Sequence, residues 1–94
     1  MSSSPRFRAR PDVVVAELDG GSVLLDLTTS AYYSLNPVGL FLWRELEEPR
    51  AAGELQLAVR AAYDVDEAVC ARDVDALLEA LQARKLLLRE PDAA

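Results

Sequence analysis

A chain of 94 residues, 51% of them apolar, is long enough for one small domain with a modest hydrophobic core. Its net charge of −6 argues against general nucleic-acid binding, because the neutralisation of phosphates requires clustered lysine and arginine side chains. Histidine is absent, which removes the commonest general base and metal ligand, and no apolar run approaches the ~20 residues of a membrane helix.

The N-terminus and the cysteine usage predict a cytoplasmic protein. The first residues, "MSSSPRFRAR", lack the apolar core of a signal peptide. A single cysteine, Cys70, excludes an internal disulfide, and its place on the apolar stripe of a predicted helix indicates a small core residue. No phosphate loop, metal-ligand cluster or nucleophile–base pair is recognisable. The sequence therefore predicts a protein that is not an enzyme and has no cofactor, metal site or catalytic residue.

The N-terminal half predicts a small antiparallel sheet. Residues 1–11 are rich in Ser, Arg and Pro and are expected to be flexible. Three short segments follow that are apolar, rich in β-branched or aromatic residues and separated by turn residues. These predicted strands cover residues 12–18, 22–27 and 31–35, with turns at "DGG" (19–21) and "TTS" (28–30). The short connections favour a three-stranded meander.

From Asn36 onwards the apolar period changes from that of a strand to that of a helix. Asn36 is a good N-cap, Pro37 fits the first helical position, and Asp66 can cap a later helix. The predicted helices cover residues 37–46, 51–63 and 66–84, followed by an apolar "LLL" (86–88) and a flexible tail (89–94). This order predicts the α+β class, as a winged helix-turn-helix in which a three-stranded antiparallel sheet precedes a three-helix bundle.

Alternation divides the predicted strands into two faces. In the second strand one face carries Val23, Leu25 and Leu27, and the other carries Ser22, Leu24 and Asp26. In the third strand, "AYYSL", Tyr32 and Tyr33 are neighbours, so only one of them can face the core. This strand has no charge and no proline, which are the devices that protect a sheet edge. It is either a central strand or an edge that is kept open for a partner strand.

The charge of the third predicted helix argues against DNA recognition. In a winged helix-turn-helix this helix would lie against DNA. It carries more acidic than basic residues: Asp66, Glu67, Asp73, Asp75 and Glu79 against Arg72, Arg84 and Lys85. Phosphates would repel such a helix, so no nucleic acid is expected as a partner.

Two segments together, "LLDLTTSAYYSLNPVGLFLW" and "LAVRAAYDVDEAVCARDVDALLEALQARKLL", resemble the PqqD-like family. Its members are the recognition elements for the precursors of ribosomally synthesised and post-translationally modified peptides (RiPPs). The resemblance covers residues 12–88 and is most specific in the passage ending "YYSLNPVG". The chain most resembles the stand-alone elements of lasso-peptide pathways. Ser30 departs from the pattern, because relatives often have Gly in this turn.

This resemblance implies a peptide-binding adaptor. The leader segment of a precursor would add as a strand to the third strand, lie in a groove against the third helix, and be presented to a processing enzyme, in lasso systems a leader protease. The residues carried over are those of the third strand and of one helix flank: Ala31, Tyr32, Tyr33, Ser34, Leu35, Asp73, Leu77, Ala80 and Arg84.

Two alternatives remain open at this point. The opposite flank of the third helix, with Ala71, Leu78 and Lys85, is equally compatible with the helical period. The second function that the pattern allows is an acidic winged-helix regulatory protein that binds another protein or, less strongly, DNA. Neither interpretation predicts a membrane partner.

Overall fold

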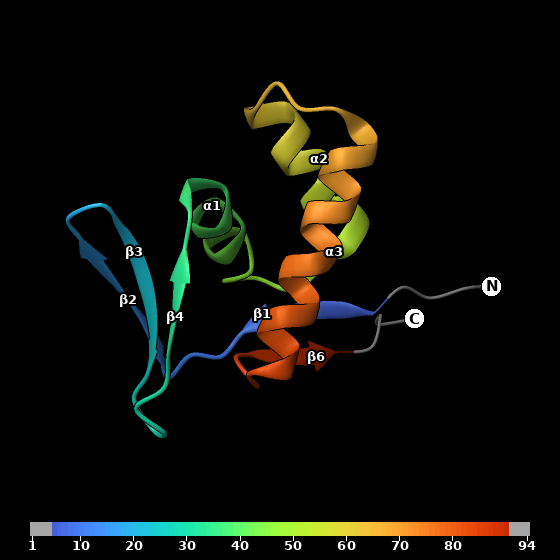
Figure 1. The fold of residues 1–94 in the computed structure, drawn as a ribbon. Coiled ribbons are helices and arrows are strands. Elements are labelled where there is room, and N and C mark those ends of the chain that lie inside the picture. The colour runs from blue at the N-terminus through green and yellow to red at the C-terminus, as the bar shows by residue number, and fades with distance from the viewer. Residues whose placement is uncertain (1–4, 91–94) are drawn as a thin grey trace.

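The structure, a computed structural model, describes residues 5–90 and has the α+β class that the sequence predicts. Its elements are, in chain order, β1 (Arg6–Ala9), β2 (Val13–Leu18), β3 (Gly21–Asp26), β4 (Tyr32–Leu35), α1 (Pro37–Glu45), β5 (Arg50–Ala51), α2 (Ala52–Ala62), α3 (Glu67–Ala83) and β6 (Leu87–Glu90). Figure 1 shows α1 between the β2-β3-β4 sheet and the helices α2 and α3. Within residues 5–90, no helix is both long enough and apolar enough to cross a membrane.

The predicted meander is confirmed as the antiparallel sheet β2-β3-β4. A two-residue turn joins β2 to β3, since Leu18 pairs with Gly21, and Gly20 in this turn has a φ of +90°, which favours glycine. β4 pairs with β3, and none of the other strands within residues 5–90 pairs with β4. The third predicted strand is therefore an edge of the sheet and not its centre.

The expectation of a single sheet is wrong, because β1, β5 and β6 form a second antiparallel sheet in the order β5-β1-β6. β1 pairs with β6 along its whole length, from Arg6 opposite Glu90 to Ala9 opposite Leu87. The apolar residues of "RFRA" alternate with arginines, and Phe7 and Ala9 are buried. Burial of these side chains and backbone pairing hold the strand in place.

The second sheet includes residues from both of the terminal segments that the sequence predicts to be flexible. Residues 6–9 of the 1–11 segment and residues 89–90 of the 89–94 segment are paired strand residues. Residues 1–4 and 91–94 lie outside the described residues. The apolar "LLL" docks as expected at its first two positions, where Leu86 and Leu87 are buried.

The predicted helices and their caps are confirmed. The Gly39 N–H donates to the side-chain oxygen of Asn36 at 2.7 Å, which caps α1. The side chain of Asp66 caps α3 by accepting hydrogen bonds from the N–H groups of Ala68 and Val69, at 3.0 and 3.3 Å. Cys70 is buried in the core, with its Sγ 3.6 Å from the Gln56 carbonyl oxygen. The winged helix-turn-helix arrangement of these helices stays a prediction.

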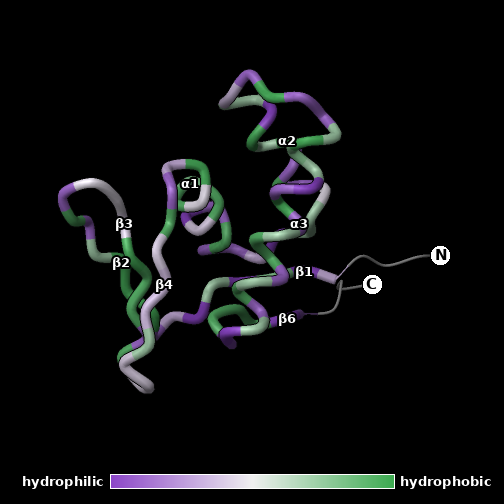
Figure 2. The backbone as a smooth tube through the Cα atoms, viewed as in Figure 1, coloured by the Kyte–Doolittle hydropathy of each residue, from purple (hydrophilic) through white to green (hydrophobic). Residues whose placement is uncertain are grey.

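The core is formed by the three helices together with residues from both sheets, including Phe7 of β1 and Leu87 of β6. The strand β3 turns its less apolar face, with Ser22, Leu24 and Asp26, toward the interior. Leu24 is fully buried, and Asp26 is only 2% exposed. The outer face of this sheet is apolar and open, with Leu18 at 62%, Leu27 at 61% and Tyr32 at 68% exposure. Figure 2 shows the hydrophobic residues that run along β2 and β3. The buried face of β3 thus ends in a carboxylate, that of Asp26. This buried charge is stabilised by an ion pair with Arg10 and by the Thr28 N–H.

Candidate functional site

The orientation of β4 decides which of its two adjacent tyrosines, Tyr32 or Tyr33, faces the core. Tyr33 is half-buried and packs against the core, whereas Tyr32 is exposed on the outer face of the sheet. The carbonyl of Ala31 accepts from the Asp26 N–H at 2.9 Å, which fixes the hydrogen-bonding phase at the start of β4. Because antiparallel pairing alternates, Tyr33 directs its backbone groups toward β3, and Tyr32 and Ser34 direct theirs outward. The outward groups form a template for one further strand.

A cavity of about 380 Å³ lies beside this edge. One wall is formed by Tyr33 of β4 and the beginning of α1, and the other wall by α3. Gly39 lies in the first wall, and a Cβ at its position would come within 3.1 Å of the Leu35 side chain. Glycine therefore permits the close approach of β4 to α1. The lining residues are Tyr33, Asn36, Val38, Gly39, Leu42, Val59, Val65, Cys70, Asp73, Val74, Ala76 and Leu77.

A second, shallower hollow follows the outer edge of β4 and shares Tyr33 with the cavity. It is lined by residues of the turn and strand and by one residue from the end of α3: Ser30, Ala31, Tyr32, Tyr33, Ser34 and Arg84. The Arg84 guanidinium carbon lies 4.8 Å from the centre of the Tyr33 ring, a cation–π contact. We call the cavity and this hollow together the β4–α3 groove; Asp73 lines the cavity and Arg84 lines the hollow.

The structure brings most of the predicted site residues together around the β4–α3 groove. Those that line it are Ala31, Tyr32, Tyr33, Ser34, Asp73, Leu77 and Arg84. Leu35 is instead buried and packs over Gly39, and Ala80 is half-buried and lines neither part of the groove. That any of the nine predicted site residues contacts a peptide stays a prediction.

The opposite flank of α3 faces a different part of the molecule. Leu78 is 4% exposed and lines a separate cavity together with Phe7 of β1 and Ala52 of α2. Lys85 lies past the end of α3, and its backbone carbonyl accepts a hydrogen bond from Arg10. The geometry thus places the flank with Asp73 and Leu77, and not the flank with Leu78, opposite β4.

Sequence reasoning missed the residues that α1 and the start of α3 contribute to the groove. Asn36, Val38 and Gly39 form one wall, and Val65 and Cys70 belong to the other side. The N-cap at Asn36 was a usable signal, because a helix that begins directly after the third strand starts beside the end of that strand. Cys70 reads as a core residue, which it is, and it also lines the cavity.

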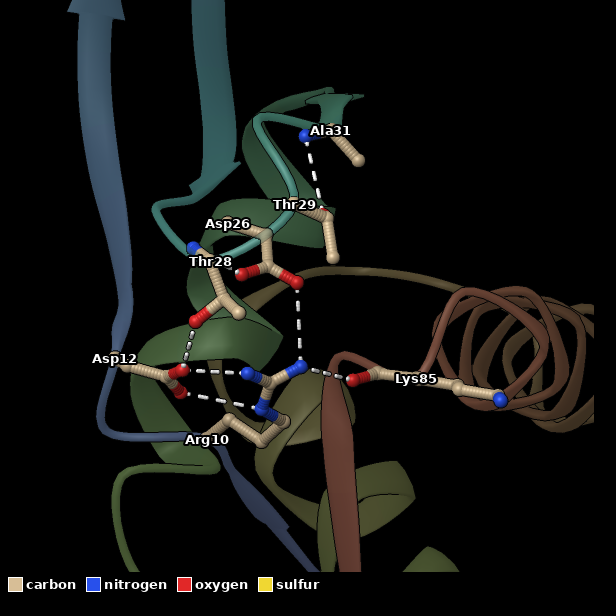
Figure 3. Close-up of polar contacts among 7 residues, drawn as sticks. All are labelled: Arg10, Asp12, Asp26, Thr28, Thr29, Ala31 and Lys85. Carbon is tan, nitrogen blue, oxygen red and sulfur yellow. Dashed lines mark hydrogen bonds and ion pairs between the residues drawn. The ribbon is translucent and has the colours of Figure 1, made fainter.

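An arginine outside the groove, Arg10, joins several segments, as Figure 3 shows. Arg10 pairs with Asp12 through two nitrogens and donates through Nη1 to Asp26 at 3.2 Å and to the Lys85 carbonyl at 2.7 Å. The Thr28 N–H and then Arg10 lower the pKa of the Asp26 carboxyl, against the opposing effect of its desolvation. Hydrogen bonding to Arg10 likewise lowers the pKa of Asp12. Both carboxylates are therefore held in the charged form.

Residues 5–90 contain no group of three or more acidic, cysteine or histidine side chains placed to hold a metal ion. The pairing edge, the apolar cavity beside it and the charged residues along it are features of a surface that binds an extended peptide.

A family model described as coenzyme PQQ synthesis protein D (PqqD) matches residues 21–87. The chain belongs to the PqqD family. The matched region of this PqqD-family chain runs from β3 to the first residue of β6 and therefore contains β4, α3 and the whole groove between them. A comparison with curated proteins finds no match.

Two solved structures are similar to this PqqD-family chain. One is TbiB1 in complex with the TbiA(beta) leader peptide, with 38% sequence identity and a TM-score of 0.72 over 85% of this chain and 93% of that one. The other is lasso peptide synthetase B1 complexed with the leader peptide, with 29% identity and a TM-score of 0.72 over 87% of this chain and 96% of that one. Both similar proteins hold a leader peptide.

Proposed function

We propose that this chain binds the leader segment of a ribosomally made precursor peptide and presents it to a processing enzyme. The leader adds as a strand to the edge of β4 and lies in the β4–α3 groove. The observation that carries the proposal is the open, uncharged edge of β4 directly beside a cavity whose opposite wall is α3. The leader peptides bound to both similar proteins support it.

Affinity and selectivity come from different parts of this site. The outward backbone groups of Tyr32 and Ser34 pair with any extended peptide, so they supply affinity without sequence preference. A leader also loses backbone entropy on ordering, which the site must offset. We expect one or two apolar or aromatic leader side chains to enter the cavity against Leu77 and Tyr33 and to provide the selectivity.

The proposed role is that of an adaptor rather than a catalyst. The groove is built from backbone, apolar side chains and the separate charges of Asp73 and Arg84, which suit recognition of a peptide. We expect the processing enzyme to be the leader protease of a lasso-peptide pathway. The similarity to lasso peptide synthetase B1 supports the assignment to such a pathway. We place this step in the cytoplasm, where a ribosomal precursor is made.

The genes next to the one that encodes this chain, and a titration, test the proposal. We expect a short precursor gene, a protease gene and a cyclase gene among the neighbours. The leader segment of that precursor, labelled with fluorescein, should bind the purified chain saturably at one site, and the core segment of the same precursor should not. Absence of leader binding by a folded chain would overturn the proposed function.

A further inference from the structure

Arg10 lies outside the β4–α3 groove and yet connects both of its walls. It follows β1, and its side chain is mostly buried, with 21% exposure. Its guanidinium group contacts Asp12, two residues along the chain, and two partners that are distant in the sequence, Asp26 and the carbonyl of Lys85. None of the residues that line the groove is among these partners.

On the sheet side, the contact with Asp26 reaches the beginning of β4. Asp26 ends β3, and its side chain accepts from the Thr28 N–H at 2.9 Å. Its backbone N–H donates to the Ala31 carbonyl at 2.9 Å, and its carbonyl accepts from the Ser30 N–H at 2.8 Å. Asp26 thus organises the whole turn from which β4 begins, and Arg10 holds Asp26.

On the helix side, the contact with Lys85 reaches the end of α3. Lys85 has a φ of +59°, a left-handed conformation, and its N–H donates to the Gln82 carbonyl while the Leu86 N–H donates to the Leu81 carbonyl. This is the Schellman arrangement that ends a helix. Arg10 accordingly holds the residue next to Arg84, whose guanidinium group covers the Tyr33 ring of β4.

We propose that Arg10 is a positioning residue for leader binding, which sets the separation of β4 from α3 at the Arg84 end of the groove. The inference rests on the proposed function and deepens it. Arg10 does not contact the leader. A planar guanidinium with donors in fixed directions can hold Asp12, Asp26 and the Lys85 carbonyl at the same time, which a lysine ammonium on a flexible stem cannot do with the same geometry. The contact between Arg84 and Tyr33 also joins the two walls at this end of the groove.

The test must separate positioning from folding, because removing Arg10 alone leaves Asp26 charged and buried. The double variant Arg10→Met/Asp26→Asn avoids this. Asparagine keeps the carbonyl oxygen that accepts from the Thr28 N–H. No buried carboxylate is then left without its partner here, because Asp12, which also loses Arg10, is exposed to solvent. Arg6→Met is the matched control, because Arg6 is on β1 and its ion pair with Glu54, at 2.8 Å, ties that strand to α2 and not to the groove.

Leader affinity is measured by fluorescence anisotropy with the labelled leader, and folding by thermal unfolding. We expect Arg10→Met and the double variant to bind the leader about tenfold more weakly, Arg10→Lys to be intermediate, and Arg6→Met to stay within about twofold of the native chain. The double variant should regain thermal stability relative to Arg10→Met but should not regain affinity. The contact between the Tyr33 ring and the Arg84 side chain should give NMR cross-peaks in the native chain, and we expect these cross-peaks to weaken in the double variant.

Recovery of native affinity together with stability would overturn the proposal, since Arg10 would then act on folding alone. If the double variant does not fold, Arg10→Lys carries the test, because it retains the charge beside Asp26. Native affinity in a folded Arg10→Lys would then overturn the proposal. A native chain that binds no leader would instead refute the proposed function, so the two failures are distinct.

Discussion

The guanidinium group of Arg84 lies over the ring of Tyr33, with its central carbon 4.8 Å from the ring centre. This contact joins the end of α3 to the open edge strand β4 along the groove that we assign to a leader peptide. Arg84 is exposed, and Tyr33 is half-buried with part of its side chain against the core.

We expect the contact between Arg84 and Tyr33 to stabilise the fold by about 0.5–1 kcal/mol, because it is partly exposed to solvent. A double-mutant cycle with Arg84→Gln and Tyr33→Leu, followed by urea unfolding, measures the coupling directly. Arg72→Gln, on the same helix, serves as the control with Tyr33→Leu and should show no coupling. Equal coupling in the two cycles would contradict a specific contact.

Proline substitutions test the direction of the β4 backbone. Ser34→Pro should leave the β3–β4 pairing intact and weaken leader binding by at least ~1.4 kcal/mol, about tenfold, because the lost N–H points outward. Tyr33→Pro should instead lower the melting temperature, because the Tyr33 N–H faces β3. Thermal unfolding and leader titration of both variants provide the measurement. Loss of stability in Ser34→Pro with none in Tyr33→Pro would mean that the assigned phase is reversed.

Filling the cavity should block the leader. Ala76 is exposed and lines the cavity, so Ala76→Trp should occupy the space of a leader side chain and reduce affinity about tenfold or more, with little change in melting temperature. Ala80→Trp should have a smaller effect on affinity, because Ala80 lines neither part of the groove. Ala61→Trp on α2 is the matched control, and it should bind the leader normally. A native affinity of Ala76→Trp would place the leader elsewhere.

Glycine at the end of α3 should stabilise the protein. Lys85 has a φ of +59°, which costs a residue with a Cβ roughly 1 kcal/mol relative to glycine. Lys85→Gly should therefore raise the melting temperature by about 4–8 °C, while the backbone carbonyl still accepts from Arg10. Gln82→Gly, within the helix, is the control and should lower it. A fall in melting temperature for Lys85→Gly would show that the lysine side chain contributes more than its backbone strain costs.

Stability should fall in acid, and Asp26 should carry part of the loss. The Thr28 N–H and Arg10 lower the pKa of Asp26 below its ordinary value of 3.8, so the folded state favours the charged form. The stabilisation is thus fully present above the unfolded value and is lost as the pH falls from about 4 toward the lower folded value. Melting temperatures between about pH 2 and 7 should fall less steeply in Asp26→Asn than in the native chain. Parallel curves of melting temperature against pH for the two proteins would exclude a contribution of Asp26. We expect Asp12 and Glu54, whose pKa values are also lowered, to account for the pH dependence that remains in Asp26→Asn.

Much of the local structure was predictable because it depends on neighbouring residues. The caps at Asn36 and Asp66 act on N–H groups two or three residues away, and the turn at Asp19–Gly20 depends on the left-handed preference of glycine. The change from a strand period to a helix period likewise appears within a few residues. The passage "YYSLNPVG" combines several of these signals, so that it carried both the fold of the groove's first wall and the family resemblance.

The tertiary structure alone decided which surfaces meet. β1 and β6 pair although about 80 residues separate them, and a four-residue strand has no local signal for so distant a partner. The same holds for the flank of α3 that faces β4 and for the inward orientation of Asp26. The Asp26 carboxylate is satisfied locally by the Thr28 N–H and also by Arg10, which comes from another segment. Local periodicity indicates that a face is apolar or a strand edge is unprotected. The partner that covers it depends on how the chain closes in three dimensions, because burial and charge pairing act between residues that are neighbours only in space.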